Sequence, residues 1–157
     1  MTVEEMLARG AIRATIAAYT AAGDRLREAE LAACFTGDGV IETEGVAEMD
    51  SFRYEGREAI GAWIARWRDR TADDGPVHQA TFVRHHLTTC HIELTGPDSA
   101  RARTYWSAWT DIGPDHAGYY LDSFRREGAQ WLITHRRIRE DWRSSASLFT
   151  NAVAHSR

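Results

Sequence analysis

The hydrophobic period of the chain changes at Pro76, and this change limits the folds that are open to it. Before Pro76, apolar residues recur at helical spacing, as in Ile60, Trp63, Ile64 and Trp67 at i, i+3, i+4 and i+7. After Pro76, strand-like segments alternate with short turn sequences. Helices followed by an antiparallel meander favour an α+β fold with the helices packed on one face of a sheet.

Three helices are expected in the first half of the chain. The first begins with a capping box, in which Glu5 follows Thr2 by three residues, and ends near Gly23. The other two are expected at about 28–35 and 57–70.

Between the second and third helices, the sequence predicts little regular structure. The Gly-Asp-Gly run at 37–39 has turn chemistry, and a short strand is expected at 40–43. Residues 45–55 are expected to form a polar loop. The meander is expected to run through strands at about 80–94, 100–110, 118–126 and 131–142.

The 157 residues fit a single domain, with a core over about 5–142 and a tail at 143–157. A net charge of -4 gives no footprint for nucleic acid. No apolar run approaches the length that crosses a membrane, and the acidic start of the chain does not have the composition of a signal peptide. A cytoplasmic location is therefore expected. Cys34 and Cys90 are expected to be buried thiols rather than a disulfide.

All 19 basic residues are arginine, and the absence of lysine removes several classes of chemistry. Schiff-base enzymes and Walker-type phosphate loops both need a lysine. The sequence also lacks Gly-x-Ser-x-Gly and Gly-x-Gly-x-x-Gly. His85, His86 and His91 do not fall on one side of a strand, so no metal is expected. Any chemistry is expected to use side chains alone, without a cofactor.

Asp24 is the most informative candidate site residue. It follows the first expected helix, on the flank of an apolar face that includes Ile16 and Tyr19. A negative charge at a helix C-terminus opposes the helix dipole, so helix stability does not explain the residue. A carboxylate in this place must be solvated, for example beside Arg25, or paired. His85 is a candidate partner, and a His–Asp pair in an apolar pocket can transfer protons.

The layout and six local motifs resemble the SnoaL-like family of the nuclear transport factor 2-like superfamily. The motifs lie at residues 19–24, 33–40, 56–60, 84–88, 118–124 and 131–142. The resemblance implies a cone-shaped α+β barrel, in which three N-terminal helices pack on a highly curved antiparallel sheet around a pocket. It also implies a homodimer or higher homo-oligomer through the outer sheet face.

Catalytic roles are carried over by the resemblance onto Asp24, His85 and Tyr19. His85 would act as a general base that Asp24 orients, and Tyr19 would donate a hydrogen bond to developing negative charge. The alternatives are a core histidine bonded to a backbone carbonyl and a core tyrosine. Some relatives carry a further acid or histidine in the strand expected at 100–110, where this chain has Ala-Trp-Thr at 108–110. Either the acid–base constellation is simpler in this chain, or its third member is Asp122 or an arginine.

Four residues are predicted to bind substrate: Tyr105, Trp109, Tyr120 and Arg136. Tyr105 and Trp109 share a strand face that Trp106 does not share, and periodicity alone leaves open which face points inward. For Arg136 the alternative is a structural salt bridge with Asp122.

Together these features predict a cofactor-independent lyase that acts on a small hydrophobic, aromatic or polycyclic substrate. Elimination of water is the most concrete version, and loss of another small fragment uses the same groups. An isomerase or polyketide-type cyclase with the same dyad is an alternative. A non-catalytic binding or subunit protein on the same fold is another.

Overall fold

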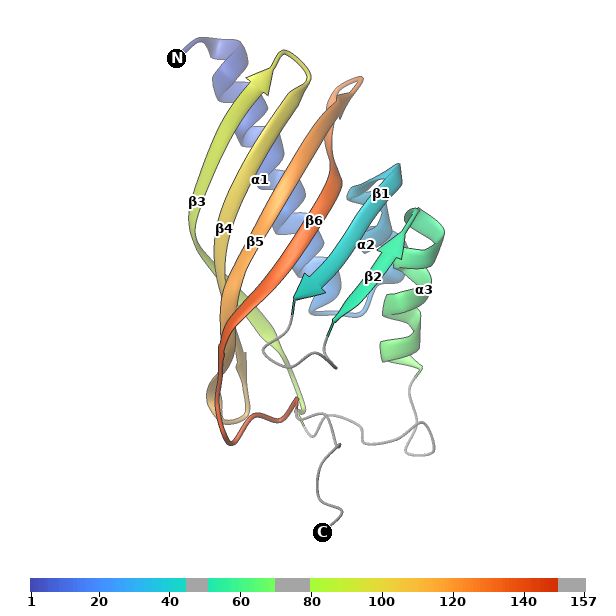
Figure 1. The fold of residues 1–157 in the computed structure, drawn as a ribbon, viewed down its shortest axis with the longest axis vertical. Coiled ribbons are helices and arrows are strands. Elements are labelled where there is room, and N and C mark those ends of the chain that lie inside the picture. Colours follow the sequence, from blue (N-terminus) through green and yellow to red (C-terminus); the bar gives the residue numbers. More distant parts are fainter. Residues whose placement is uncertain (45–50, 70–79, 150–157) are drawn as a thin grey trace.

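A computed structural model describes residues 1–44, 51–69 and 80–149 of the chain (Figure 1). The elements in order are α1 (Val3–Gly23), α2 (Glu28–Ala33), β1 (Phe35–Glu44), β2 (Phe52–Glu55), α3 (Arg57–Arg68), β3 (Arg84–Gly96), β4 (Ser99–Thr110), β5 (Gly113–Glu127) and β6 (Gln130–Arg143). The long strands β3 to β6 curve around α1, which lies on one face of the sheet. None of the helices in the described ranges is long and apolar enough to cross a membrane.

The six strands form one sheet in the order β2-β1-β6-β5-β4-β3. The predicted α+β architecture, three helices followed by a meander, is confirmed. The sheet is mixed rather than wholly antiparallel, because β1 pairs with β6 in parallel while the other pairings are antiparallel. It is also open, with β2 and β3 as its two edges among the described residues. Local turn chemistry could not reveal the parallel pairing, because β1 and β6 are distant in sequence.

Tertiary pairing also overrides two local expectations near β1. The predicted turn at 37–39 is wrong: these residues lie within β1, where the register with β6 shifts between Phe35 and Val40. The predicted loop at 45–55 contains β2, because Phe52 to Glu55 pair with Thr43 to Val40. Residues 45–50 of that loop and residues 150–157 of the predicted tail lie outside the described residues.

The core between α1 and the sheet contains one fully buried ion pair. The side chains of Arg136 on β6 and Asp122 on β5 are both completely buried. Nε and Nη2 of Arg136 donate to the two carboxylate oxygens of Asp122 at 2.8 and 2.7 Å. The guanidinium carbon lies 4.0 Å from the ring centre of Tyr19 on α1 and 4.2 Å from that of Tyr120 on β5. The pair therefore joins α1, β5 and β6 through hydrogen bonds and cation–π contacts.

Irregular pairing bends the sheet around this core. The register of β5 with β6 shifts between Ala117 and Gly118 and again between Ser123 and Phe124. At Gly118 the backbone of β6 approaches so closely that a Cβ atom would collide with the carbonyl oxygen of Arg139. Bulges of this kind increase strand twist and bend the strand.

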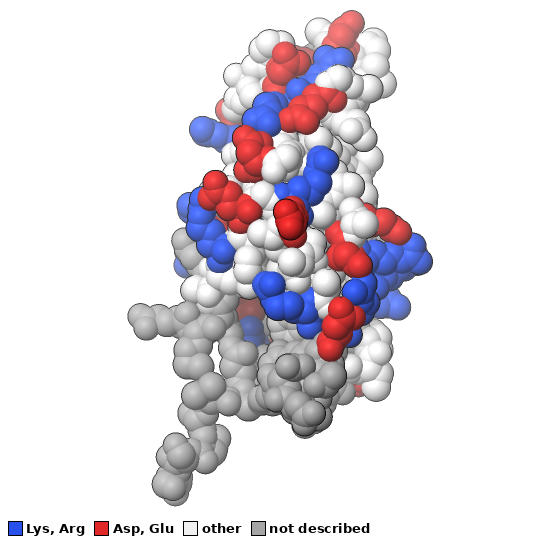
Figure 2. All heavy atoms as spheres, turned by 90° about the vertical axis from the view of Figure 1, so that its right-hand side faces the viewer, with Lys and Arg blue, Asp and Glu red and all other residues white. Residues whose placement is uncertain are grey.

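On the face shown in Figure 2, acidic and basic side chains are interspersed rather than gathered by sign. Several ion pairs lie at the protein surface, including Arg53 with Glu42 and Arg68 with Glu28. Exposed pairs of this kind contribute little to stability.

Replacing Asp122 with alanine should lower the free energy of unfolding by about 3–5 kcal/mol, because the Arg136 charge would stay buried without its carboxylate. Urea denaturation measures the change. Asp141→Ala is the matched control, since Asp141 pairs with Arg139 at the surface, and it should change stability little. If both variants lost the same free energy of unfolding, the buried pair would contribute no more to stability than a surface pair, contrary to the prediction.

Gly118→Ala should cost about 1–3 kcal/mol of stability, because the added methyl group overpacks the β5–β6 contact. Gly10→Ala should have the opposite sign. Gly10 lies in α1 with no atom within 4 Å of an added Cβ, and alanine favours a helix over glycine by about 1 kcal/mol. Thermal unfolding of both variants tests whether Gly118→Ala is less stable and Gly10→Ala more stable than the unsubstituted protein.

Candidate active site

A cavity of about 930 Å³ lies between the helices and the concave face of the sheet. Titratable and aromatic side chains of α1, β3, β4 and β5 line one part of it, and the aromatic residues of β2 and α3 line another. The residues that line the cavity include Tyr19, Asp24, Phe52, Tyr54, Trp63, His85, Trp106, His116, Tyr120, Glu140, Arg143 and Phe149.

Asp24 and His85 are in direct contact in this cavity. Asp24 caps the C-terminus of α1, and its backbone N–H donates to Thr20 O at 3.0 Å. Its Oδ1 lies 2.6 Å from His85 Nδ1, and its Oδ2 accepts from the His85 backbone N–H at 3.0 Å. The carboxylate thus holds both the ring and the main chain of His85. Because an ionised carboxylate only accepts, Nδ1 carries the proton and Nε2 is left for a ligand.

The question whether Asp24 is solvated or paired is therefore answered by the geometry: its side chain is 10% exposed and paired. His86 points to the other sheet face, where its ring lies 5.5 Å from that of Trp109. Strand alternation accordingly separates the two neighbouring histidines.

Tyr19 and Tyr120 form a floor of the cavity above the buried ion pair. Their ring centres are 6.0 Å apart in an edge-to-face arrangement. Burial raises the pKa of Tyr19 to about 12, although the charge of Arg136 opposes the shift. The Tyr19 phenol therefore stays protonated at neutral pH and can donate a hydrogen bond.

Arg136 does not take the substrate-binding place predicted for it. It lies beneath the two tyrosine rings, fully buried against Asp122, and is not part of the cavity wall. The structural salt bridge considered as the alternative is confirmed. Its Nη1 lacks a hydrogen-bond partner among the described residues, while the guanidinium carbon lies over the Tyr19 and Tyr120 rings.

Tyr105 and Trp109 are also misplaced by the prediction. They lie on the outer face of β4 and are 43% and 42% exposed, whereas Trp106 is buried and lines the cavity. A signal in the sequence could have settled the choice. Arg101 and Arg103 share the face of Tyr105 and Trp109, and a strand face with two arginines is the solvated one.

Sequence reasoning missed a second histidine–carboxylate pair, His116 with Asp115. His116 Nδ1 lies 2.8 Å from Asp115 Oδ1. Neighbouring residues of a regular strand point to opposite faces, so strand alternation does not predict a contact between Asp115 and His116. The register of β4 with β5 shifts here, since Ala108 faces His116 while Trp109 faces Pro114. Asp115 is the extra residue of this bulge, and bulges re-aim side chains in this way.

Asp115 is completely buried and anchors the segment that follows β6. Its carboxylate accepts from Ser147 Oγ at 2.5 Å, from the Leu148 backbone N–H at 2.9 Å and from Thr110 Oγ1 at 3.1 Å. Burial opposes ionisation, but the hydrogen bonds from Ser147, Leu148 and His116 outweigh it and hold the pKa of Asp115 below its usual value.

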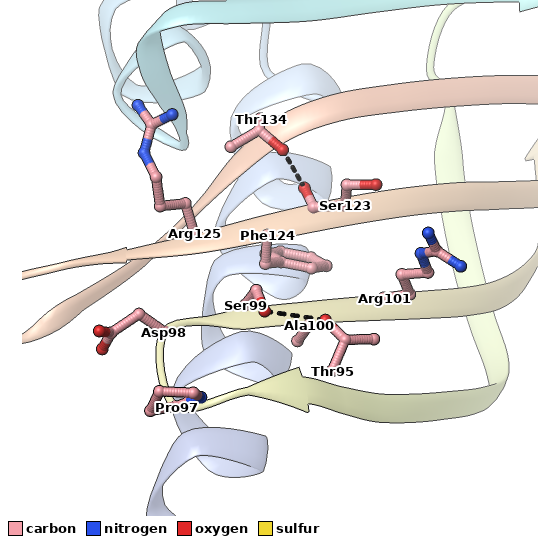
Figure 3. Close-up of a pocket in the computed structure, with 10 residues that line it drawn as sticks. All are labelled: Thr95, Pro97, Asp98, Ser99, Ala100, Arg101, Ser123, Phe124, Arg125 and Thr134. Carbon is pink, nitrogen blue, oxygen red and sulfur yellow. Dashed lines mark hydrogen bonds between the residues drawn. The ribbon is translucent and has the colours of Figure 1, made fainter.

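A second hollow, of about 530 Å³, lies near the β3–β4 turn (Figure 3). Thr95, Ser99, Ser123 and Thr134 contribute hydroxyl groups to it. Thr95 donates to Ser99 Oγ, and Thr134 donates to the backbone oxygen of Ser123. The lining of this hollow contains no histidine or cysteine. Within residues 1–44, 51–69 and 80–149, no group of three or more His, Cys, Asp or Glu could hold a metal.

The sequence profile of the SnoaL-like domain family matches residues 4–137. Among functionally curated proteins, none matches the chain significantly. Solved structures with the same fold are numerous. A protein from Novosphingobium aromaticivorans, provisionally assigned as a scytalone dehydratase, is 21% identical with a TM-score of 0.70, over 92% of this chain and 91% of that one.

Two further solved structures are similar to this chain over most of its length. The hexachlorocyclohexane dehydrochlorinase LinA-type3 from Novosphingobium barchaimii is 16% identical with a TM-score of 0.70, over 95% of this chain and 98% of that one. The Mycobacterium tuberculosis protein Rv3472, of unknown function, is 25% identical with a TM-score of 0.71, over 98% and 83%.

The environment of His116 predicts a pH dependence of stability. Burial lowers the pKa of His116 below its ordinary value of 6.5, and the charge of His85 lowers it further, against the opposing effect of Asp115. The unfolded chain then binds this proton more readily than the folded protein, so stability should fall as the pH drops below about 6.5.

His116→Gln should therefore lose less stability than the unsubstituted protein between about pH 7 and pH 5. Urea denaturation at several pH values measures the slope. Parallel stability profiles for the two proteins would contradict the lowered pKa.

Proposed function

Because the chain belongs to the SnoaL-like domain family, we propose that it is a cofactor-independent lyase that acts on a small hydrophobic, aromatic or polycyclic molecule. The observation that carries the proposal is the Asp24–His85 contact inside the cavity. A histidine with one nitrogen held by a carboxylate and the other facing an apolar cavity has the arrangement of a general base.

Elimination of water uses the pair in a simple sequence. His85 Nε2 takes a proton from a carbon next to the carbon that bears the hydroxyl. The electron pair of the broken C–H bond forms the double bond, and the C–O bond breaks with its electrons on oxygen. The imidazolium then returns its proton to that oxygen, and water leaves. Asp24 stabilises the imidazolium between the two transfers.

Tyr19 supports the same step, since it lines the cavity and its phenol stays protonated at neutral pH. It would donate to negative charge that develops on the substrate or leaving group. The structures named above include a dehydratase assignment and a dehydrochlorinase, and both names describe eliminations. Loss of a small fragment other than water would need no additional residue.

Two other functional hypotheses are compatible with the same fold. An isomerase or cyclase would move the proton without expelling a group, so its product would have the same mass as the substrate. A binding protein would have no need for a histidine held at two points by a carboxylate. A homodimer through the outer sheet face, where Tyr105, Trp109 and Leu121 are exposed, remains a prediction.

Asp24→Asn and His85→Gln should each reduce turnover by at least about 100-fold, because each removes part of the general base. The substrate is sought by mass spectrometry in a panel of aromatic and polycyclic alcohols, where a loss of water marks elimination. His86→Gln is the matched control, since His86 lies next to His85 but on the outer face. Near-full turnover in both dyad variants would rule out the proposed mechanism, and an unchanged product mass would favour the isomerase.

A further inference from the structure

His116 lies close to His85 in the cavity and has no role in the reaction proposed above. The two ring centres are 6.2 Å apart. Trp106 packs against both, with its ring centre 5.7 Å from that of His85 and 5.6 Å from that of His116. Phe149 contacts the His116 ring from another side, at 5.3 Å. Both histidines therefore belong to the same part of the cavity wall.

Asp115 determines which nitrogen of His116 a ligand can meet. Its carboxylate is bonded to Nδ1 and is itself held by Ser147, Leu148 and Thr110. An ionised carboxylate accepts only, so Nδ1 is the protonated nitrogen in the neutral ring. Nε2 then presents a lone pair and no hydrogen.

Burial keeps the His116 ring neutral near pH 7, against the two carboxylates that act on it. His85 on β3, Asp115 on β5 and Glu140 on β6 are the titratable groups that act on it. Glu140 is neutralised by Arg143, whose Nε and Nη2 donate to its carboxylate at 2.7 Å. Burial is the largest effect and lowers the pKa of His116, and the charge of His85 acts in the same direction. The ring is thus an acceptor at Nε2 under ordinary conditions.

A different part of the cavity wall is flat and aromatic. Phe52 and Tyr54 of β2 pack with Trp63 of α3, with ring centres 4.7 to 5.9 Å apart. These three rings line the same cavity as the two histidines. Such a surface favours a planar apolar ligand, because stacked and edge-to-face ring contacts add to the burial of area.

We propose that His116, positioned by Asp115, is a ligand-binding residue that accepts a hydrogen bond from a hydroxyl group, so that the cavity selects hydroxylated planar aromatic molecules. This selection rests on the proposed function, in which His85 and Asp24 act at saturated carbons elsewhere in the same molecule. His116 then orients the hydroxyl, and a molecule without a donor at that position leaves Nε2 unpaired.

The test compares the binding of 2-naphthol with that of 2-methoxynaphthalene, which has the same rings but no donor. The protein should prefer 2-naphthol by about 3- to 10-fold, the range for one neutral hydrogen bond. His116→Phe should abolish the preference while retaining affinity for the rings. His86→Phe, on the outer face, should keep it. Titration calorimetry near neutral pH measures the binding of both ligands to all three proteins.

A second measurement needs no substitution and decides the matter if His116→Phe does not fold. Long-range proton–nitrogen NMR of the labelled histidines should show the His116 ring in its Nδ1-protonated tautomer. An Nε2-protonated tautomer, a preference that survives in His116→Phe, or no binding of either naphthalene would overturn the proposal. Binding preference and turnover are separate readouts. If His85→Gln loses turnover but the protein shows no preference for 2-naphthol, this inference alone is wrong. If the protein prefers 2-naphthol but His85→Gln keeps its turnover, the proposed lyase mechanism alone is wrong.

Discussion

The buried ion pair between Arg136 and Asp122 is the constraint on which the rest of the structure depends. Two charges without solvent must be matched closely, and here both hydrogen bonds are short and the guanidinium lies between the rings of Tyr19 and Tyr120. This arrangement ties the first helix to the centre of the sheet. It also turns the two tyrosines into a floor, so the depth and chemistry of the cavity follow from the pair beneath it.

Both histidine–carboxylate pairs of the cavity occur where regular backbone ends. Asp24 caps the C-terminus of α1, and Asp115 is the extra residue of a β-bulge. At such points a side chain is not confined to the face that helix or strand periodicity assigns to it. Each carboxylate can therefore reach the Nδ1 of a histidine from a direction that a regular element would not allow. In both pairs the consequence is the same, an imidazole with a fixed orientation and a free Nε2.

Much of the fold could be predicted from the sequence, because helical and strand periods are local properties. The three helices and the meander follow from such patterns. The prediction that Tyr105 and Trp109 lie on the inner face of β4 was wrong, although the two arginines on the same face indicate that this face is solvated. His116 could not have been predicted, since its partner Asp115 lies next to it and strand alternation separates neighbours. The partnership of Asp24 with His85 came from the family resemblance rather than from spacing.

The sequence by itself determined the class of fold and the chemistry that is possible: no lysine, no phosphate loop, and a carboxylate whose position helix stability does not explain. Tertiary structure alone decided which groups meet. The parallel pairing of β1 with β6, the burial of Arg136 and the bulge at Asp115 all depend on contacts between residues far apart in the chain or on a shift in strand register. Local periodicity reports only which face a residue prefers, whereas a site is made by elements whose relative positions are set when the core packs around its buried charges.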